Sequence, residues 1–162
     1  MADEKIVEDI PDDDPKTVAN KSIRNHVITS MGAGLIPFPM LDLVTITGVQ
    51  LNMLRKLSKI YEVPFSEHKV KNIISSLIGG GGSVPVAGAF ASLAKFIPVV
   101  GHTIGSVSLP ITAGAITYAV GKVFLQHFAS GGTFLTFDPD RVRDYYNEML
   151  KEGKSMSAGM KA

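Results

Sequence analysis

The stretch that decides the fold is residues 96–121, FIPVVGHTIGSVSLPITAGAITYAVG, which carries no formal charge over 26 residues. A second uncharged run, residues 72–94, precedes it, and only Lys95 separates the two. Each run exceeds the ~20 residues that a helix needs to cross ~30 Å of hydrocarbon. Glycine and proline interrupt both runs, so helices built from them need packing partners. We therefore expect lipid, or further copies of the chain, to hide this tract from water.

The rest of the composition limits what the protein does. Its 162 residues suit one domain, and its net charge of +1 gives no reason to expect a nucleic-acid partner. The absence of cysteine excludes disulfides, thiol nucleophiles and cysteine-bound zinc. We expect an acidic disordered arm at residues 1–15, a single helical membrane-associated domain at 16–150 and a flexible tail at 151–162.

The apolar part of the sequence is expected to form two helical hairpins. Pro37-Phe38-Pro39 splits an earlier apolar stretch into arms at residues 23–36 and 40–61. The first arm is only ~21 Å long as a helix, which favours a shallow or soluble hairpin over two crossings. The two uncharged runs form the second hairpin. The predicted fold is all-α, with two apolar helical hairpins and a C-terminal amphipathic helix.

That last helix is expected to start at Asp138-Pro139, after a short extended piece at residues 133–137. Its apolar stripe includes Tyr145 and Tyr146, and it docks either on the helix at 40–61 or on another protein. Arg55, Lys56 and Lys59 form a basic face that suits an anionic lipid surface, a partner helix or plain solvation. Basic flanks on both hairpins place the termini on the cytoplasmic side of a membrane.

Small residues recur at helical spacing through the apolar part. Such residues let helix backbones approach closely in lipid, which predicts tight pairing and a homo-oligomer, although glycines in loops would give the same pattern. The helix-packing residues predicted in this way are Gly32, Ala87, Ala91, Gly101, Gly105, Gly114, Ala115, Ala119 and Gly121.

Three polar residues within apolar sequence are candidates for an intramembrane site: Asp42, Lys95 and His102. An ionisable group inside a membrane points to function by default. Asp42 also stands where a helix N-terminus favours a carboxylate, so a capping role is the simpler interpretation. If the segment is soluble, Lys95 and His102 are simply exposed.

Several of these motifs together resemble a known family. The pieces IPFPMLDL, LRKLSKIYEV, IPVVGHTIGS and ITYAVGKVFLQHF are similar to the YcjF-like family, a bacterial domain of unknown function found fused to, or encoded beside, small GTPases. The likeness spans roughly residues 20–150. It implies an α-helical, membrane-associated protein that works with a GTPase, and it supplies no catalytic motif.

No sequence feature indicates an enzyme, a cofactor or a metal. The run Gly79-Gly80-Gly81-Gly82-Ser83 lacks the spacing and lysine of a phosphate-binding loop, so any GTP chemistry belongs to a partner. The four histidines have no ligand spacing, and no serine lies in a nucleophile motif.

The sequence thus predicts a non-enzymatic, membrane-embedded or membrane-attached scaffold that self-associates, works with a partner GTPase and shapes the bilayer. Two alternatives stay open. One is a transport or pore component, in which the three polar residues face water. The other is a soluble helical homo-oligomeric interaction module that hides the same apolar surfaces.

Overall fold

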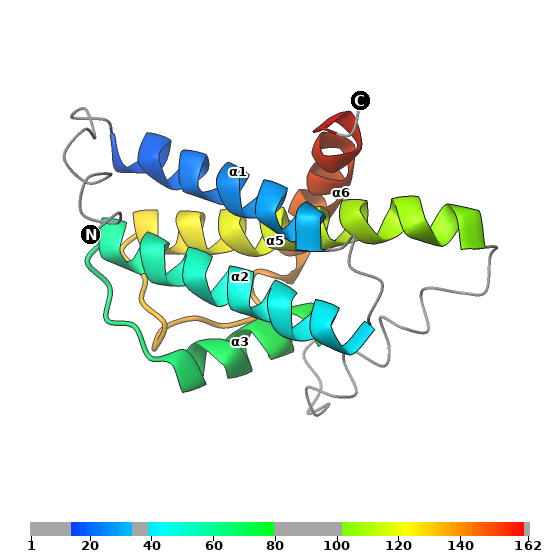
Figure 1. Ribbon diagram of the computed structural model, residues 1–162. Coiled ribbons are helices and arrows are strands. Elements are labelled where there is room, and N and C mark those ends of the chain that lie inside the picture. Colours follow the sequence, from blue (N-terminus) through cyan, green and yellow to red (C-terminus); the bar gives the residue numbers. More distant parts are fainter. Residues whose placement is uncertain (1–13, 34–38, 80–101, 161–162) are drawn as a thin grey trace, which may run out of the picture.

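The computed structural model describes residues 14–33, 39–79 and 102–160, and this part of the chain folds into five α-helices with no strand. The helices are α1 (Pro15–Ala33), α2 (Pro39–Ile60), α3 (Glu67–Gly79), α5 (His102–Ala129) and α6 (Arg143–Met160). Figure 1 shows α1 and α2 side by side and running in opposite directions, with α5 along them and α6 crossing α5, on which it packs. The all-α prediction is confirmed.

Local sequence explains where these helices begin. Pro15 and Pro39 are each the first residue of a helix, where a missing N–H costs nothing and the fixed φ favours the helix. The carbonyl of Asp14 accepts hydrogen bonds from the N–H groups of Thr17 and Val18 at 2.8 and 3.2 Å. At α3, the Ser66 carbonyl accepts from Val70 N–H at 3.0 Å.

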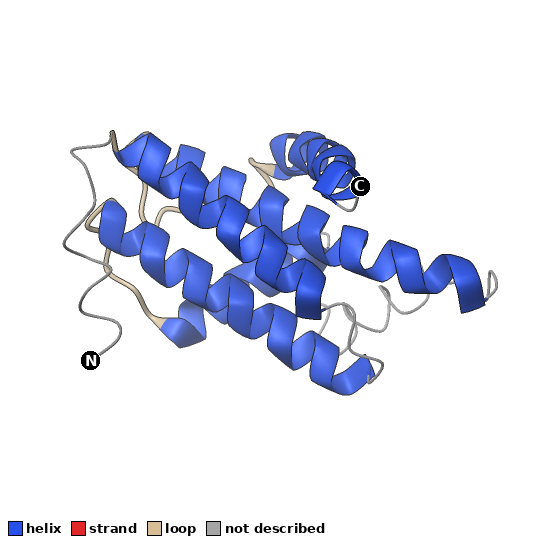
Figure 2. Ribbon diagram, turned by 45° about the horizontal axis from the view of Figure 1, so that its top comes forward, coloured by secondary structure: helices blue, strands red, loops and turns tan. Residues whose placement is uncertain are grey.

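The central helix is α5. Residues 113–121 are all buried, and their small or apolar side chains surround the helix on every side. A helix that is apolar all round belongs in a core, and here α1, α2 and α6 cover it (Figure 2). The expectation that lipid or further copies hide this tract is therefore wrong for residues 113–121, because the chain's own helices do so. Residues 80–101 lie outside the described part.

An aromatic cluster closes the bundle where α5 ends. Phe124 stacks on Phe137 with ring centroids 4.4 Å apart, and Phe128 meets Phe134 edge-on at 5.0 Å. Residues 133–137, expected to be extended, instead form turns, in which Thr136 N–H donates to the Thr133 carbonyl at 3.2 Å. The turns let Phe134 and Phe137 point back onto α5.

The C-terminal helix differs from its prediction in three ways. It begins at Arg143 rather than near Asp138, because turns occupy residues 138–142. It packs on α5, not on the helix at 40–61. It also continues to Met160 with Gly153 and Ser157 buried, so the flexible tail expected at 151–162 is wrong for residues 151–160. Residues 1–13 of the expected acidic arm lie outside the described part.

Candidate functional site

The relative register of α1 and α2 is fixed by one contact. Asn52 Nδ2 lies 3.3 Å from His26 Nε2, so position 26 of α1 is level with position 52 of α2. Because the two helices are antiparallel and rise equally per residue, Lys56 is level with Ser22 and Lys59 with Ala19.

This register places four exposed cations at nearly the same level of the bundle. Lys21 and Arg24 on α1 and Lys56 and Lys59 on α2 are all exposed, and they occupy levels equivalent to positions 19–24 of α1. At ~1.5 Å per residue they span about 7.5 Å along the bundle axis. None of the four forms an ion pair with another described residue. We call these four residues the basic belt.

Lys122 of α5 lies at the same level of the bundle as the basic belt. Its Nζ donates a hydrogen bond to Asn20 Oδ1 at 2.9 Å, and it lies 5.8 Å from the ring centroid of Tyr118. It is the one residue of α5 with a formal charge. The charged part of α5 therefore coincides with the charged part of the α1–α2 pair.

Beyond the belt, the same three helices are almost free of charge. We call residues 25–33 of α1, 39–54 of α2 and 102–121 of α5 the low-charge end, and its one formally charged residue is Asp42. Figure 1 shows these segments gathered at one end of the bundle, where α5 reaches beyond α1. The helices α1 and α2 thus share a charge boundary at one level, and Lys122 of α5 lies at that level.

The described surface of the low-charge end is uncharged but mixed, because the exposed amides of Asn25 and Asn52 lie on it beside apolar groups. Ile28 is 52% exposed, and Gly32 and Gly48 are exposed with no atom within 4 Å of an added Cβ. The Thr29 hydroxyl donates to the Asn25 carbonyl at 2.9 Å, so it needs no water partner. Ser30 and Thr117, by contrast, are fully buried and share a hydroxyl contact of 2.8 Å.

His26 is a buried titratable group in this part of the bundle. It is 6% exposed, and Nδ1–H donates to the Ser22 carbonyl at 2.7 Å while Asn52 donates to Nε2. Burial lowers the pKa of His26, the bond to Ser22 opposes that shift, and the nearby charge of Lys56 lowers the pKa further. The ring is therefore held neutral with its proton on Nδ1.

The predicted small residues occupy different environments. A Cβ on Gly114 would lie 2.6 Å from Ser157 Oγ, and one on Gly121 would lie 2.8 Å from Ile23 Cγ1, so both lie at close helix contacts within the chain. Ala115 and Ala119 are fully buried. A Cβ on Gly32 would meet no described atom within 4 Å, and Gly105 lies within α5. Ala87, Ala91 and Gly101 lie outside the described part.

The predicted polar and surface residues are also separated. Asp42 is the fourth residue of α2 and His102 the first of α5, both at the low-charge end, while Lys95 lies outside the described residues. Arg55 is turned toward α3, where it pairs with Glu67 at 3.4 Å. Tyr145 is half-buried. Tyr146 is only 4% exposed, which corrects its assignment as a membrane or partner contact in this fold.

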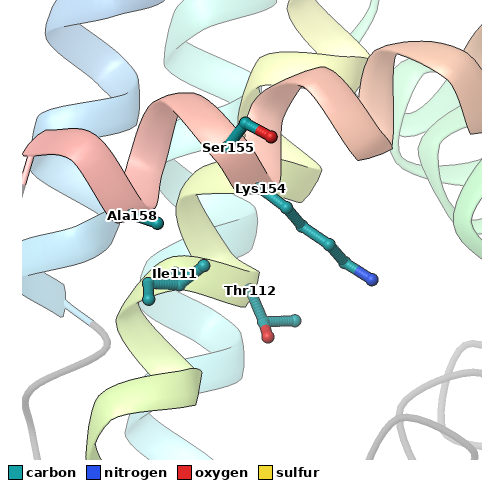
Figure 3. A pocket seen from close by; sticks show the side chains of 5 residues that line it. All are labelled: Ile111, Thr112, Lys154, Ser155 and Ala158. Carbon is teal, nitrogen blue, oxygen red and sulfur yellow. The ribbon is translucent and has the colours of Figure 1, made fainter.

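A shallow hollow lies between α5 and α6. Figure 3 shows it lined by Ile111 and Thr112 from α5 and by Lys154, Ser155 and Ala158 from α6, with Lys154 extending past Thr112. It is open to solvent and has one charged group, so it offers no enclosed site for catalysis or for a small ligand.

Two residues that matter for the fold were not singled out from the sequence. Gly153 lets α6 approach α5, since a Cβ there would lie 2.9 Å from the Ala115 carbonyl oxygen. Arg143 donates to the carbonyls of Leu77 and Ser76 at 2.5 and 3.2 Å, which caps the end of α3. A glycine inside an amphipathic helix signals the first, whereas no local pattern signals a contact across 66 residues.

Neither a membrane-spanning helix nor a metal-binding cluster is found among the described residues. No helix there combines the length and the hydrophobicity of a membrane span. No group of three or more histidine or acidic side chains in the described ranges is arranged to hold a metal ion.

Comparison with known proteins places the chain in a family. The family described as "Domain of unknown function (DUF697)" matches residues 12–155. Magnetosome membrane protein 22 of Magnetospirillum gryphiswaldense is 40% identical over 149 residues, which cover 90% of this chain and 75% of that protein. No solved structure matches the chain significantly. The link to GTPases implied by the sequence resemblance stays a prediction. Because the match spans most of its length, the chain belongs to the family of proteins that share the domain of unknown function DUF697.

Proposed function

We propose that the protein is a non-enzymatic scaffold attached to a membrane through its low-charge end. One observation carries this proposal: α1 and α2 change from charged to nearly uncharged at the same level of the bundle, and the one lysine of α5 lies at that level. A fold that gathers the nearly uncharged ends of three helices at one pole, with Lys154 of α6 as a neighbouring cation, matches the division between headgroups and hydrocarbon.

The lengths of the helices support insertion from one side. From Lys21 to the end of α1 is about 18 Å, and from Lys56 back to the start of α2 is about 26 Å, both below the ~30 Å hydrocarbon thickness. The α1–α2 pair would enter the bilayer without crossing it. Lys21 and Lys56 then stay on the side of entrance, which the positive-inside tendency assigns to the cytoplasm.

The similarity to Magnetosome membrane protein 22 also supports membrane attachment. Its name, Magnetosome membrane protein 22, describes a membrane protein, and this chain is 40% identical to it over 90% of its own length. We extend membrane association from that relative to this chain.

Three finer activities complete the proposal. Helices that enter one leaflet displace lipid unevenly, which is a physical route to bilayer curvature. The exposed Gly32 and Gly48 offer close approach to a second copy, because nothing in the described chain fills the space above them. The sequence resemblance to the YcjF-like family suggests that a GTPase acts in trans with the scaffold.

Fractionation of cells that express the full chain, followed by an alkaline carbonate wash, tests this function. We expect the protein to sediment with membranes, to resist the wash and to be released by detergent. A protein that stays in the high-speed supernatant at neutral pH as a detergent-free monomer would contradict the proposal. Release by the alkaline wash alone would contradict insertion of the low-charge end.

A further inference from the structure

We infer that the basic belt, Lys21, Arg24, Lys56 and Lys59, binds anionic phospholipid headgroups of the leaflet that the low-charge end enters. This inference rests on the proposed membrane attachment and adds the chemistry of the lipid. Its basis is the charge pattern of the described surface together with the register of α1 and α2.

The belt is a concentrated positive surface on two adjacent helices. Along the entire described lengths of α1 and α2 there are six lysine and arginine residues and one acidic residue, Asp42. Asp42 lies fourteen residues from Lys56, about 21 Å along α2, which is beyond the ~8 Å screening length at physiological salt. The belt cations are therefore not neutralised from within their own helices.

Several other cations of the described chain form ion pairs, whereas Lys16 and Lys69 are exposed and have no ion pair among the described residues. Arg55 and Lys71 pair with Glu67 at 3.4 and 2.9 Å, and Arg141 pairs with Asp138 at 3.5 Å. On α6, acidic and basic residues are interspersed, so that surface has mixed charge. The belt differs because its four members are exposed, share one sign and have no ion-pair partner among the described residues.

The position of the belt favours a lipid over an acidic soluble protein. An acidic protein would bind a basic patch at any place on the surface. Here the cations lie next to the charge boundary, at the level where headgroups would surround the bundle once the low-charge end is inserted. Phosphate-bearing headgroups of one leaflet meet all four cations at once, because those cations span only about 7.5 Å along the axis.

Vesicle flotation with the full chain tests this inference. The probes are vesicles of phosphatidylcholine alone and of phosphatidylcholine with about 30% phosphatidylserine, at about 0.15 M salt, with K56Q/K59Q and K21Q/R24Q as the belt variants. Each cation near an anionic surface contributes about 1 kcal/mol, or about fivefold in partitioning. We expect each double variant to lose about 25-fold on anionic vesicles and little on neutral ones.

Two controls separate charge from folding and from overall net charge. K151Q/K154Q removes the same charge from exposed positions of α6, where Lys154 lies beside Thr112 of the low-charge end, so we expect no loss of binding to anionic vesicles. K56R/K59R keeps the charge and should bind like the parent chain. Circular dichroism verifies that all variants are folded.

The outcomes distinguish the two proposals. If the parent chain binds neutral and anionic vesicles equally, or if the belt variants bind like K151Q/K154Q, the inference is wrong while membrane attachment stands. If K56R/K59R loses binding as K56Q/K59Q does, charge is not the cause and the inference is also wrong. If the parent chain floats with neither vesicle, the proposed function itself fails.

Discussion

Lys122 Nζ donates a hydrogen bond to Asn20 Oδ1 at 2.9 Å, which ties the one charged residue of α5 to the basic half of α1. The contact joins residues 102 positions apart in the sequence. Because α5 is otherwise uncharged, this bond places the one cation of the central helix level with the charge boundary of α1 and α2.

Charge added at the low-charge end should weaken membrane attachment. Ile28 is 52% exposed, so Ile28→Lys leaves the fold intact but places a cation where lipid is expected. A lysine deep in hydrocarbon costs about 2.5 to 3.5 kcal/mol, and less where its long side chain reaches the headgroups. We expect at least a tenfold loss in flotation with neutral vesicles. Leu135→Lys, at the 78% exposed Leu135 in the turn after α5, is the matched control and should bind normally.

The close crossing of α5 and α6 should depend on Gly153. Gly153→Ala would bring a Cβ to 2.9 Å from the Ala115 carbonyl oxygen, and such overpacking costs about 1 to 3 kcal/mol. Gly159→Ala on the same helix has free space and should stabilise by up to about 1 kcal/mol through helix propensity. Thermal unfolding followed by circular dichroism in one mild detergent measures both. Equal midpoints for the two variants would refute this packing.

Arg143 should stabilise the end of α3 from a distance. Its guanidinium donates to the carbonyls of Leu77 and Ser76 in the last turn of α3, where helix carbonyls lack intrahelical partners in general. Arg143→Ala should cost about 1.5 to 3 kcal/mol and speed hydrogen exchange in the last turn of α3. Arg141→Ala, at a side chain that is 86% exposed, should change stability by less than about 0.5 kcal/mol. Unchanged exchange in α3 after Arg143→Ala would show that the contact does not cap the helix.

His26 should make the fold sensitive to mild acid. Burial lowers its pKa in the folded state below the ordinary 6.5, so between those two pKa values the unfolded chain binds more protons. Stability is therefore complete above pH 6.5 and is lost as the pH falls below 6.5. Urea unfolding at pH 7.5, 6.5 and 5.5 should show this loss in the parent chain and a weaker one in His26→Gln. A parent chain equally stable at pH 5.5 and 7.5 would contradict the assigned environment of His26.

The sequence predicted the helices better than their partners. Apolar periodicity and the proline turn placed the start of α2 at residue 40, one residue after Pro39, because local chemistry determines a helix start. The start of α1 was predicted less well: the first arm was expected at 23–36, whereas the helix begins at Pro15. The local sequence does not determine which helix packs against which surface. The uncharged run through Ala115 and Ala119 looked like a segment for lipid, yet it is buried by its own bundle. Lipid and protein interiors demand the same apolar side chains, so composition does not distinguish them.

In the candidate site, too, the sequence predicted residues of one helix but not how residues of different helices come together. Lys56 and Lys59 could be chosen from the sequence because a helical repeat places them on one face. Lys21 and Arg24 could not be joined to them, since the level of α1 against α2 depends on the contact between His26 and Asn52. Tyr146 was placed on a docking surface from its position in an apolar stripe, but that stripe faces α5.

Depth-dependent quenching at single cysteines tests most directly whether the low-charge end enters the bilayer. The chain has no cysteine, and the exposed Gly32 and Gly48 have space for a Cβ, so Gly32→Cys and Gly48→Cys accept an environment-sensitive fluorophore. Ser130→Cys, exposed just after α5 at the opposite end, is the reference. With anionic vesicles, we expect blue-shifted emission quenched by acyl-chain quenchers at positions 32 and 48 and water-like emission at position 130. Water-like emission at all three positions on vesicle-bound protein would contradict insertion of the low-charge end.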